Sequence, residues 1–256
     1  MADALAPFRL DGRVAIVTGS SRGIGRALAV GLAEVGASVV VTGRRVEATA
    51  DTVSEIEAAG GTALGVDYQA GDEASIGELV GLAADRFGAI DILVNNAAIL
   101  KPHRLEKVSA AELEEIHRVN VMGPVLLAKE AAGHLGSKRR GAVVMLGAVA
   151  AHRPMEGIGA YAASKASLLH WTRVMAREWA GRIRVNALTP GPVATDMILP
   201  RDPARRDAFE REMANETLVG RIATPADLVP AALFLASDAS SFMTGQTLVV
   251  DGGMLA

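Results

Sequence analysis

The sequence predicts a doubly wound α/β fold, in which a parallel β-sheet lies between two layers of helices. Three observations support this prediction. Half of the 256 residues are hydrophobic and 21% are charged, which is enough apolar material for a large core. Short apolar runs recur along the chain and alternate with longer segments of helical composition. The first apolar run leads into a glycine-rich turn, as expected where a strand is followed by a helix.

Seven apolar runs are predicted to form the sheet. They do not alternate between apolar and polar residues, so each strand is expected to be buried on both faces, as in a parallel sheet. In chain order the runs are Val14–Val17, Ser38–Thr42, Ala63–Val66, Ile90–Val94, Ala142–Leu146, Ile183–Leu188 and Thr247–Val250. Because the last run belongs to the same sheet, we expect residues 1–256 to form a single domain.

The segment from Pro190 to Thr217 differs from the rest of the chain. It holds four prolines and a run of charged residues that begins at Arg201. A linker, or a solvated helical excursion without a role, is the alternative for such a segment. We interpret residues 190–217 as a lid over the substrate, because a strand still follows them and long loops in compact domains are often lids.

Composition excludes several classes of protein. A net charge of −3 lacks the basic excess of a nucleic-acid-binding surface. Without cysteine the chain has no disulfide, thiolate nucleophile or zinc–thiolate site, and the five histidines lack the spacing of a metal site. The N-terminus does not resemble a signal peptide, and the longest apolar stretch, near Ala142 to Ala151, is too short to span a bilayer. We therefore expect a cytoplasmic protein with no metal, membrane or nucleic-acid partner.

The turn after the first strand has the composition of an anion-binding loop. Gly19, Gly23 and Gly25 allow a tight turn, and the helix that follows offers free N–H groups and a positive dipole end. A pyrophosphate fits this environment, although the spacing Gly-x-x-x-Gly-x-Gly departs from the usual dinucleotide fingerprint. The same stretch also satisfies G-x-S-x-G, so a serine hydrolase with Ser21 as nucleophile is an alternative. Its triad needs a late histidine, but the last one, His170, falls within a helical pattern.

The residues after the second strand favour NADP(H) over NAD(H). An NAD-binding fold usually places an acid there for the ribose 2′-hydroxyl. This chain has Arg44 and Arg45 instead. Arginine stays charged and binds phosphate through two hydrogen bonds, and Arg22 in the glycine loop adds a second cation. The alternative is that these arginines are ordinary surface charges.

Several motifs together resemble the short-chain dehydrogenase/reductase family, over nearly the whole chain. In the family's order and spacing they are T-G-x-x-x-G-x-G at Thr18–Gly25, an acid at Asp67, N-N-A-G as Asn95–Ala98 with Ala98 in place of glycine, a helix asparagine at Asn120, Y-x-x-x-K at Tyr161–Lys165, N-x-x-x-P-G at Asn186–Gly191, and a final strand ending at Asp251. The resemblance implies a Rossmann-type domain, a nicotinamide cofactor, and the interconversion of alcohols and carbonyls.

The resemblance also implies roles for site residues. Lys165 holds the nicotinamide ribose, Asn120 anchors a water in a proton relay, and Asp67 contacts the adenine. With the loop and its arginines, the expected cofactor site comprises Gly19, Ser21, Arg22, Gly23, Ile24, Gly25, Arg44, Asp67, Asn95, Ala97, Tyr161, Lys165, Pro190, Gly191, Val193 and Thr195. Family members are usually tetramers, less often dimers, so a homotetramer or homodimer is expected.

Tyr161 and Lys165 are four residues apart and therefore lie on one face of a helix. A free phenol has a pKa of about 10, too high for a base at neutral pH. A neighbouring ammonium is expected to lower the pKa of the phenol. Tyr161 is then suited to donate a proton to a carbonyl or to accept one from an alcohol. For such a pair taken alone, a surface contact is the alternative.

One position departs from the family. The family has a serine thirteen residues before the tyrosine, whose hydroxyl binds the reacting carbonyl, and this chain has Ala148 there. The loss of one such donor typically lowers the rate by about 10²–10³. Three explanations stay open. One is an engineered Ser→Ala replacement, which the intact Tyr161, Lys165 and Asn120 favour. The others are a natural enzyme that orients the carbonyl differently, and a binding protein that retains only the cofactor site.

The loop before Tyr161 is expected to border the substrate. It carries His152, Arg153, Met155 and Glu156, a polar rim that suits a hydroxylated or anionic substrate. We expect His152 and Met155 to contact the substrate. Other stretches resemble sugar- and polyol-oxidising members, so we predict an NADP(H)-dependent oxidoreductase that interconverts a secondary alcohol and a ketone on such a small molecule. A 3-oxoacyl-carrier-protein reductase is the alternative within the family.

Overall fold

A computed structural model of the chain describes residues 3–137 and 139–256. Within these residues, seven strands form one sheet in the order β3-β2-β1-β4-β5-β6-β7, with every neighbouring pair parallel. The strands are β1 (Val14–Val17), β2 (Ser38–Gly43), β3 (Thr62–Asp67), β4 (Ile92–Asn95), β5 (Gly141–Leu146), β6 (Ile183–Pro190) and β7 (Thr247–Val250). The predicted fold class is confirmed, and no strand end differs from the predicted one by more than two residues.

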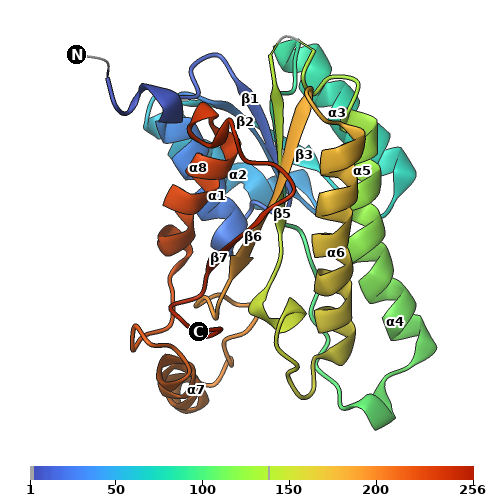
Figure 1. Cartoon of the computed structure of the whole chain (residues 1–256), viewed down its shortest axis with the longest axis vertical. Helices are drawn as coiled ribbons and strands as arrows, with labels where there is room; N and C mark the ends of the chain where they lie inside the picture. The colour runs from blue at the N-terminus through green and yellow to red at the C-terminus, as the bar shows by residue number, and fades with distance from the viewer. Residues whose placement is uncertain (1–2, 138) are drawn as a thin grey trace.

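Helices cover both faces of the sheet. They are α1 (Gly23–Glu34), α2 (Ala50–Ala58), α3 (Glu73–Phe87), α4 (Ala110–His117), α5 (Gly123–Ala131), α6 (Gly159–Glu178), α7 (Pro203–Asn215) and α8 (Val229–Ala236). Helices α1, α2 and α8 lie on one face, and α3, α5 and α6 on the other (Figure 1). In the described part of the chain, no helix combines the length and the apolar character needed to cross a membrane.

The continuous apolar runs are explained by burial on both faces. Successive residues of a strand point to opposite sides of the sheet. In β1, Ile16 joins the apolar cluster that contains Leu79 and Leu168, whereas Val17 joins the cluster that contains Leu28 and Leu235. All four residues of β1 are therefore buried, and no position of the strand favours a polar side chain.

The strand order places a ligand site at the carboxyl ends of the central strands. The chain leaves β1 toward β2 on one side and later returns to β4 on the other, so the direction of winding reverses between β1 and β4. Ligands of open α/β sheets bind beyond the carboxyl ends of the strands at such a point. The glycine-rich turn follows β1 at this point.

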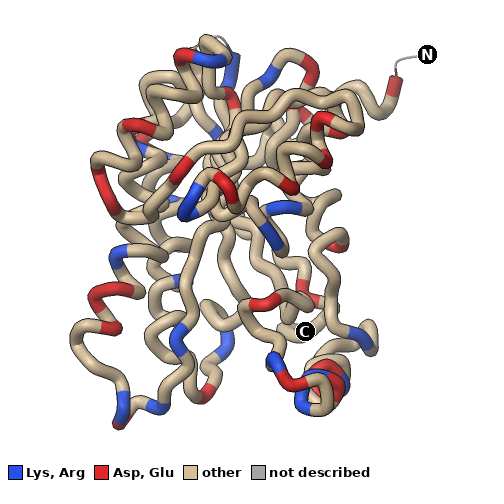
Figure 2. Tube along the Cα trace, turned by 180° about the vertical axis from the view of Figure 1, so that it is seen from behind, with Lys and Arg blue, Asp and Glu red and all other residues tan. Residues whose placement is uncertain are grey.

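The segment predicted as a lid contains α7. Strand β6 runs to Pro190, so the first residue of the segment still belongs to the sheet. Helix α7 has no buried residue and carries charges of both signs (Figure 2). The Asp202 side chain caps its start by accepting a hydrogen bond from the N–H of Ala204 at 3.0 Å. The helix lies apart from the two helical layers (Figure 1).

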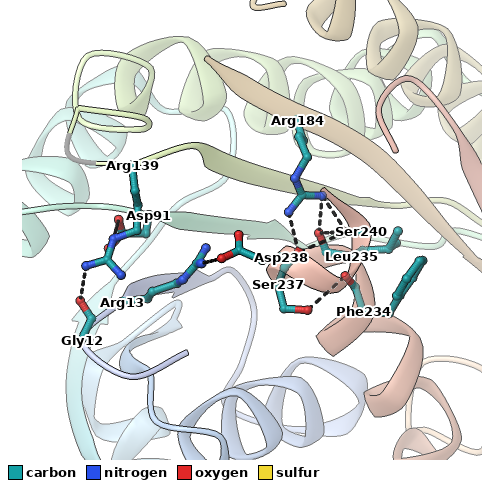
Figure 3. A network of polar contacts seen from close by, with 10 residues as sticks. All are labelled: Gly12, Arg13, Asp91, Arg139, Arg184, Phe234, Leu235, Ser237, Asp238 and Ser240. Atoms are coloured by element: carbon teal, nitrogen blue, oxygen red, sulfur yellow. Dashed lines mark hydrogen bonds and ion pairs between the residues drawn. The ribbon is translucent and has the colours of Figure 1, made fainter. Parts of the chain in front are cut away.

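The opposite edge of the sheet is held by a polar network (Figure 3). Arg184 of β6 is buried, and burial lowers the pKa of its guanidinium to about 10. It donates hydrogen bonds to three acceptors near the end of α8: the carbonyl oxygens of Leu235 (3.0 Å) and Ser237 (2.9 Å) and the hydroxyl of Ser240 (2.7 Å). Arg13, just before β1, pairs with Asp238. These contacts fix α8 to the sheet.

Candidate active site

The glycine-rich turn brings the backbone of β1 close to the start of α1. The φ angles of Gly19 and Gly23 are 63° and 57°, in the left-handed region that glycine adopts without strain. A Cβ atom on Gly25 would lie 2.3 Å from the carbonyl oxygen of Gly19. The first turn of α1 therefore packs directly against the loop. Its unpaired N–H groups border the loop, which is the environment that a pyrophosphate requires.

A cluster of hydrogen bonds fixes this turn to the end of β4. The Thr18 hydroxyl oxygen accepts from the N–H groups of Asn96 (2.9 Å) and Ala97 (3.0 Å). The Asn96 side chain donates to the carbonyls of Thr18 (2.8 Å) and Gly19 (3.1 Å). Thr18 and Asn96 belong to the motifs, but the expected cofactor site included only Ala97 of these three residues. Their positions as polar residues ending two adjacent parallel strands are the signal that could have found them.

Asn95 ends β4 and contacts α5. Its side chain is buried and donates to the carbonyl of Pro124 at 3.3 Å. The amide nitrogen thus anchors α5 to β4. Ala98 stands where the family has glycine. Its φ is not positive, because among the described residues only glycines have positive φ. Alanine is therefore compatible with the backbone at that position.

The loop after β6 also approaches the glycine turn. A Cβ on Gly23 would lie 3.4 Å from the Thr195 methyl group, and a Cβ on Gly191 would lie 2.8 Å from the backbone of Asp251. Val193 is buried beside them and pairs with Ala223. The structure therefore brings the predicted residues after β1, β4 and β6 together at one edge of the sheet.

Exposed cations stand on the β2 side of this edge. Arg44 and Arg45 follow β2 directly and are exposed, and Gly43 pairs with Asp67 at the end of β3. Arg22 projects from the glycine turn and lies 3.7 Å from the carboxylate of Asp196. A glycine turn with a free helix start and adjacent arginines fits an anionic dinucleotide that carries an additional phosphate.

Tyr161 and Lys165 lie on one face of α6, as predicted. The Lys165 Nζ atom is 5.7 Å from the centre of the Tyr161 ring and donates to the carbonyl of Leu146, at the end of β5, at 2.7 Å. Burial lowers the pKa of Lys165 to about 8. Burial also raises the pKa of Tyr161 to about 12, whereas the sequence led us to expect a lowered pKa. Desolvation outweighs the attraction of an ammonium that bonds elsewhere, so the phenol is protonated at neutral pH.

Asn120 connects the loop after β4 to α6. It lies in a π-helical turn over Arg118–Met122, a conformation often found at functional sites. Its side-chain oxygen accepts from the N–H of Ile99 (2.8 Å), and its amide donates to the Ile99 carbonyl (2.9 Å) and to the Ser164 hydroxyl (3.1 Å). Ser164 in turn donates to the carbonyl of Tyr161 at 2.6 Å. Ser164 thus links Asn120 to the tyrosine, a contact that no motif indicated.

Ala148 follows β5 and is nearly buried, with 8% of its surface exposed. Its φ and ψ angles of −165° and 152° are those of extended backbone, which serine adopts as readily. Gly147 before it packs against Thr189, whose hydroxyl oxygen would lie 2.5 Å from a Cβ on that glycine. The Thr189 hydroxyl is buried without a hydrogen-bond partner among the described residues.

The loop between β5 and α6 carries the predicted substrate residues. His152 is exposed, and Met155 is partly buried. Arg153, between them, forms an ion pair with Glu216 at 2.7 Å, which joins this loop to the end of α7. Neither the partner of Arg153 nor its contact with the predicted lid was expected from the sequence.

The serine-hydrolase hypothesis receives no structural support. Ser21 lies in the turn before α1, whereas the last histidine, His170, is exposed on α6, which covers the other face of the sheet (Figure 1).

His103 pairs with Glu112 at 2.9 Å, in the region around α4. Within residues 3–137 and 139–256, no group of three or more His, Cys, Asp or Glu residues is arranged to hold a metal ion.

Comparisons with known proteins agree on one family. The family model described as "Enoyl-(Acyl carrier protein) reductase" matches residues 19–255. The chain is 34% identical to 2-dehydro-3-deoxy-D-gluconate 5-dehydrogenase of Formosa agariphila, covering 97% of this chain and 95% of that protein. It is 36% identical to 3-oxoacyl-[acyl-carrier-protein] reductase FabG of Vibrio cholerae, covering 96% and 99%. A crystal structure of gluconate 5-dehydrogenase from Burkholderia cenocepacia, in complex with NADP and tartrate, is 36% identical with a TM-score of 0.91 and covers 99% of each chain.

Proposed function

This chain belongs to the short-chain dehydrogenase/reductase family, and from that premise we propose that it is an NADP(H)-dependent oxidoreductase that interconverts a secondary alcohol and a ketone on a small hydroxylated molecule. One observation carries the proposal. The Tyr161–Lys165 pair, Asn120 and the glycine turn gather at the same edge of the sheet, where ligands of such folds bind. The named relatives that act on gluconate-type molecules support a sugar-like substrate.

The residues divide the chemistry between them. Bound NADP(H) supplies the hydride for reduction and accepts it in oxidation. Tyr161 donates the proton that the carbonyl oxygen takes up, and its raised pKa keeps that proton on the phenol at neutral pH. Lys165 holds the cofactor ribose and restrains the tyrosine from the same helix face. Asn120, fixed through Ile99 and Ser164, supports the position of Tyr161 and a water of the proton relay.

Two sets of groups account for the proposed cofactor. The glycine turn and the N-terminus of α1 hold the pyrophosphate, and Asp67 contacts the adenine. Arg44, with Arg22, binds the 2′-phosphate that distinguishes NADP(H) from NAD(H). The NADP in the Burkholderia cenocepacia structure supports this choice.

The position of Ala148 makes the proposal directly testable. NADPH oxidation is measured with a panel of carbonyl compounds, for this chain and for Ala148→Ser. A hydroxyl at this position is expected to raise the rate about 10²-fold. Ala150→Ser, which adds a hydroxyl in the buried 3₁₀ turn just beyond, is the matched control and should not do so. If the unchanged chain and Ala148→Ser both bind NADPH but reduce no carbonyl, the chain is a cofactor-binding protein and the proposed reaction is wrong.

A second candidate activity is the reduction of 3-oxoacyl carrier-protein thioesters. The observation that favours it is the 36% identity to FabG of Vibrio cholerae. The two activities are separated by comparing a 3-oxoacyl thioester with keto-sugar acids in the same NADPH assay. Turnover of the thioester alone would make the carrier-protein reductase the correct assignment.

The proposed lid is supported by two ion pairs that join it to the site. Near its beginning, Asp196 pairs with Arg22 of the glycine turn at 3.7 Å. At its end, Glu216 pairs with Arg153 of the loop after β5 at 2.7 Å. We propose that residues 190–217 close over the substrate, with the Arg22–Asp196 pair as the attachment near their beginning. Proteolysis within α7 that slows on addition of NADPH and substrate is the expected result.

A homo-oligomer completes the proposed function. Leu113 and Met122 are exposed apolar residues, and they border a groove that Ala160 and Ala163 of α6 also line. This supports a dimer or tetramer formed through α4 and α6. Light scattering coupled to size exclusion is expected to give two or four times the chain mass of 26.5 kDa, and a monomer mass would refute the proposal.

A further inference from the structure

Arg153, on the loop after β5, and Glu216, at the end of the proposed lid, form an ion pair at 2.7 Å. Arg153 follows a 3₁₀ turn over Val149–Ala151, and its N–H donates to the Val149 carbonyl at 3.0 Å. Only four residues lie between it and Ala148, and a 3₁₀ turn rises by about 2 Å per residue. Arg153 therefore belongs to the same short loop that carries Ala148 and leads into the helix of Tyr161.

Glu216 lies at the end of α7, in a segment that is held by hydrogen bonds. It follows the last residue of α7, and the next residue, Thr217, is buried. The Thr217 hydroxyl is 3.0 Å from the carbonyl oxygens of both Ala214 and Arg221. The carboxylate is therefore held near Arg153 by the folded end of the lid segment rather than by a freely moving loop.

The pair is less fully hydrogen-bonded than the Arg221–Asp227 pair. Arg221 binds Asp227 through two parallel hydrogen bonds of 2.8 and 2.7 Å, the arrangement that satisfies both a guanidinium and a carboxylate. In the described residues, Arg153 makes a single bond, from Nη2 to the Glu216 carboxylate at 2.7 Å. A guanidinium has five N–H donors. The Arg153 side chain is 43% exposed, so most of its N–H donors remain available to a ligand.

We propose that Arg153 is a specificity-determining residue that binds a carboxylate of the substrate, and that Glu216 occupies its guanidinium while the site is empty. The inference rests on the proposed function, because it concerns the substrate of the same site. The substrate class it indicates is a small hydroxy acid and its keto acid. On binding, the substrate carboxylate pairs with the free donors of Arg153, and Glu216 either shares the guanidinium or turns to solvent.

The alternative role for this pair is a latch that only holds the lid to the loop after β5. The two roles predict different results for the two partners. A latch is broken equally by removing either charge, and its loss affects charged and neutral ligands alike. A carboxylate-binding arginine loses affinity only for acids when it is replaced, and removing the competing Glu216 has no such effect or the opposite one.

The test compares Arg153→Gln, Glu216→Gln and the unchanged chain, all loaded with NADPH. Calorimetry measures the binding of gluconate and of sorbitol, which differ by the carboxylate; no turnover occurs, because cofactor and ligand are both reduced. Arg153→Gln is expected to weaken gluconate binding about 10- to 100-fold and to leave sorbitol unchanged. Glu216→Gln is expected to bind gluconate as tightly as the unchanged chain, or more tightly. Arg173→Gln, which removes an exposed charge from the middle of α6, is the matched control.

Three results would overturn the inference. The first is equal weakening of both ligands by Arg153→Gln and Glu216→Gln, which is the behaviour of a latch. The second is gluconate binding that Arg153→Gln leaves unchanged. The third is an unchanged chain that binds gluconate no better than sorbitol. The proposed function fails separately, if Ala148→Ser reduces no carbonyl while gluconate still binds through Arg153.

Discussion

Replacing Lys165 by methionine is expected to change how the stability of the protein depends on pH. Lys165 is 2% exposed, and its ammonium has one hydrogen-bond acceptor in the structure, the Leu146 carbonyl. Burial without a carboxylate partner lowers its pKa from 10.5 to about 8. The folded protein therefore releases this proton more readily than the unfolded chain does.

The sign and size of the effect follow from this difference. Between about pH 8 and pH 10.5 the unfolded chain holds more protons, so the free energy of unfolding rises with pH over this range. Below about pH 8 the ammonium is buried in its charged form, and this stabilising term is absent. The chain with Lys165 should therefore gain about 2 kcal/mol over Lys165→Met between about pH 7 and pH 9.5.

Urea unfolding at a series of pH values measures this quantity. The free energy of unfolding of each protein is extrapolated to water, and the difference between the two proteins is plotted against pH. Tyr161 and the other titratable groups are present in both proteins and largely cancel. A difference that stays flat, or that falls as pH rises, would show that Lys165 is not desolvated as the structure indicates.

Three further changes test other parts of the structure. Tyr161→Phe is expected to lower turnover by about 10²–10⁴, because it removes the proton donor, while NADPH binding by fluorescence stays nearly the same; undiminished turnover would contradict the mechanism. Arg44→Ala should weaken NADPH about 10- to 100-fold and NADH little, so that similar losses for both would exclude the 2′-phosphate contact. Arg184→Ala removes the buried guanidinium that donates to the carbonyls of Leu235 and Ser237, which keep only the longer bonds from Ser240, and should lower the free energy of unfolding by about 3 kcal/mol, measured in urea. A loss below about 0.5 kcal/mol would mean that the Arg184 network does not anchor α8.

The sheet was predictable because its pattern is local. Runs such as Val14–Val17 are apolar at every position and mostly β-branched, as expected of a strand buried on both faces. The limits of the strands were less predictable. The predicted fourth strand begins at Ile90, whereas β4 begins at Ile92, after Asp91. The Asp91 carboxylate instead accepts a hydrogen bond from the N–H of Val14 at 2.9 Å, a contact set by the neighbouring strand.

The candidate site was predictable where motif spacing fixes a residue to a known place on a strand end or helix. Tyr161 and Lys165 are of this kind, since four residues of helix place them together. The pKa of Tyr161 was not, because it depends on burial by segments distant in the sequence. Ser164 and Glu216 were missed for the same reason. Their partners, Asn120 and Arg153, are chosen by how helices and loops pack, which no local pattern records.

The contact between the turn after β1 and the end of β4 has a consequence for folding. Thr18 and Ala97 meet across 79 residues of chain, and between them lie two complete strand–helix units. Closing a loop of this length lowers the entropy of the chain before any contact compensates for the loss. Contacts between residues so distant in sequence therefore form slowly. The cradle for the dinucleotide therefore exists only in molecules in which β1 and β4 have become neighbours. A nucleotide in solution binds only molecules in which this contact has formed. Its concentration therefore raises the free energy of unfolding and does not speed the formation of the contact.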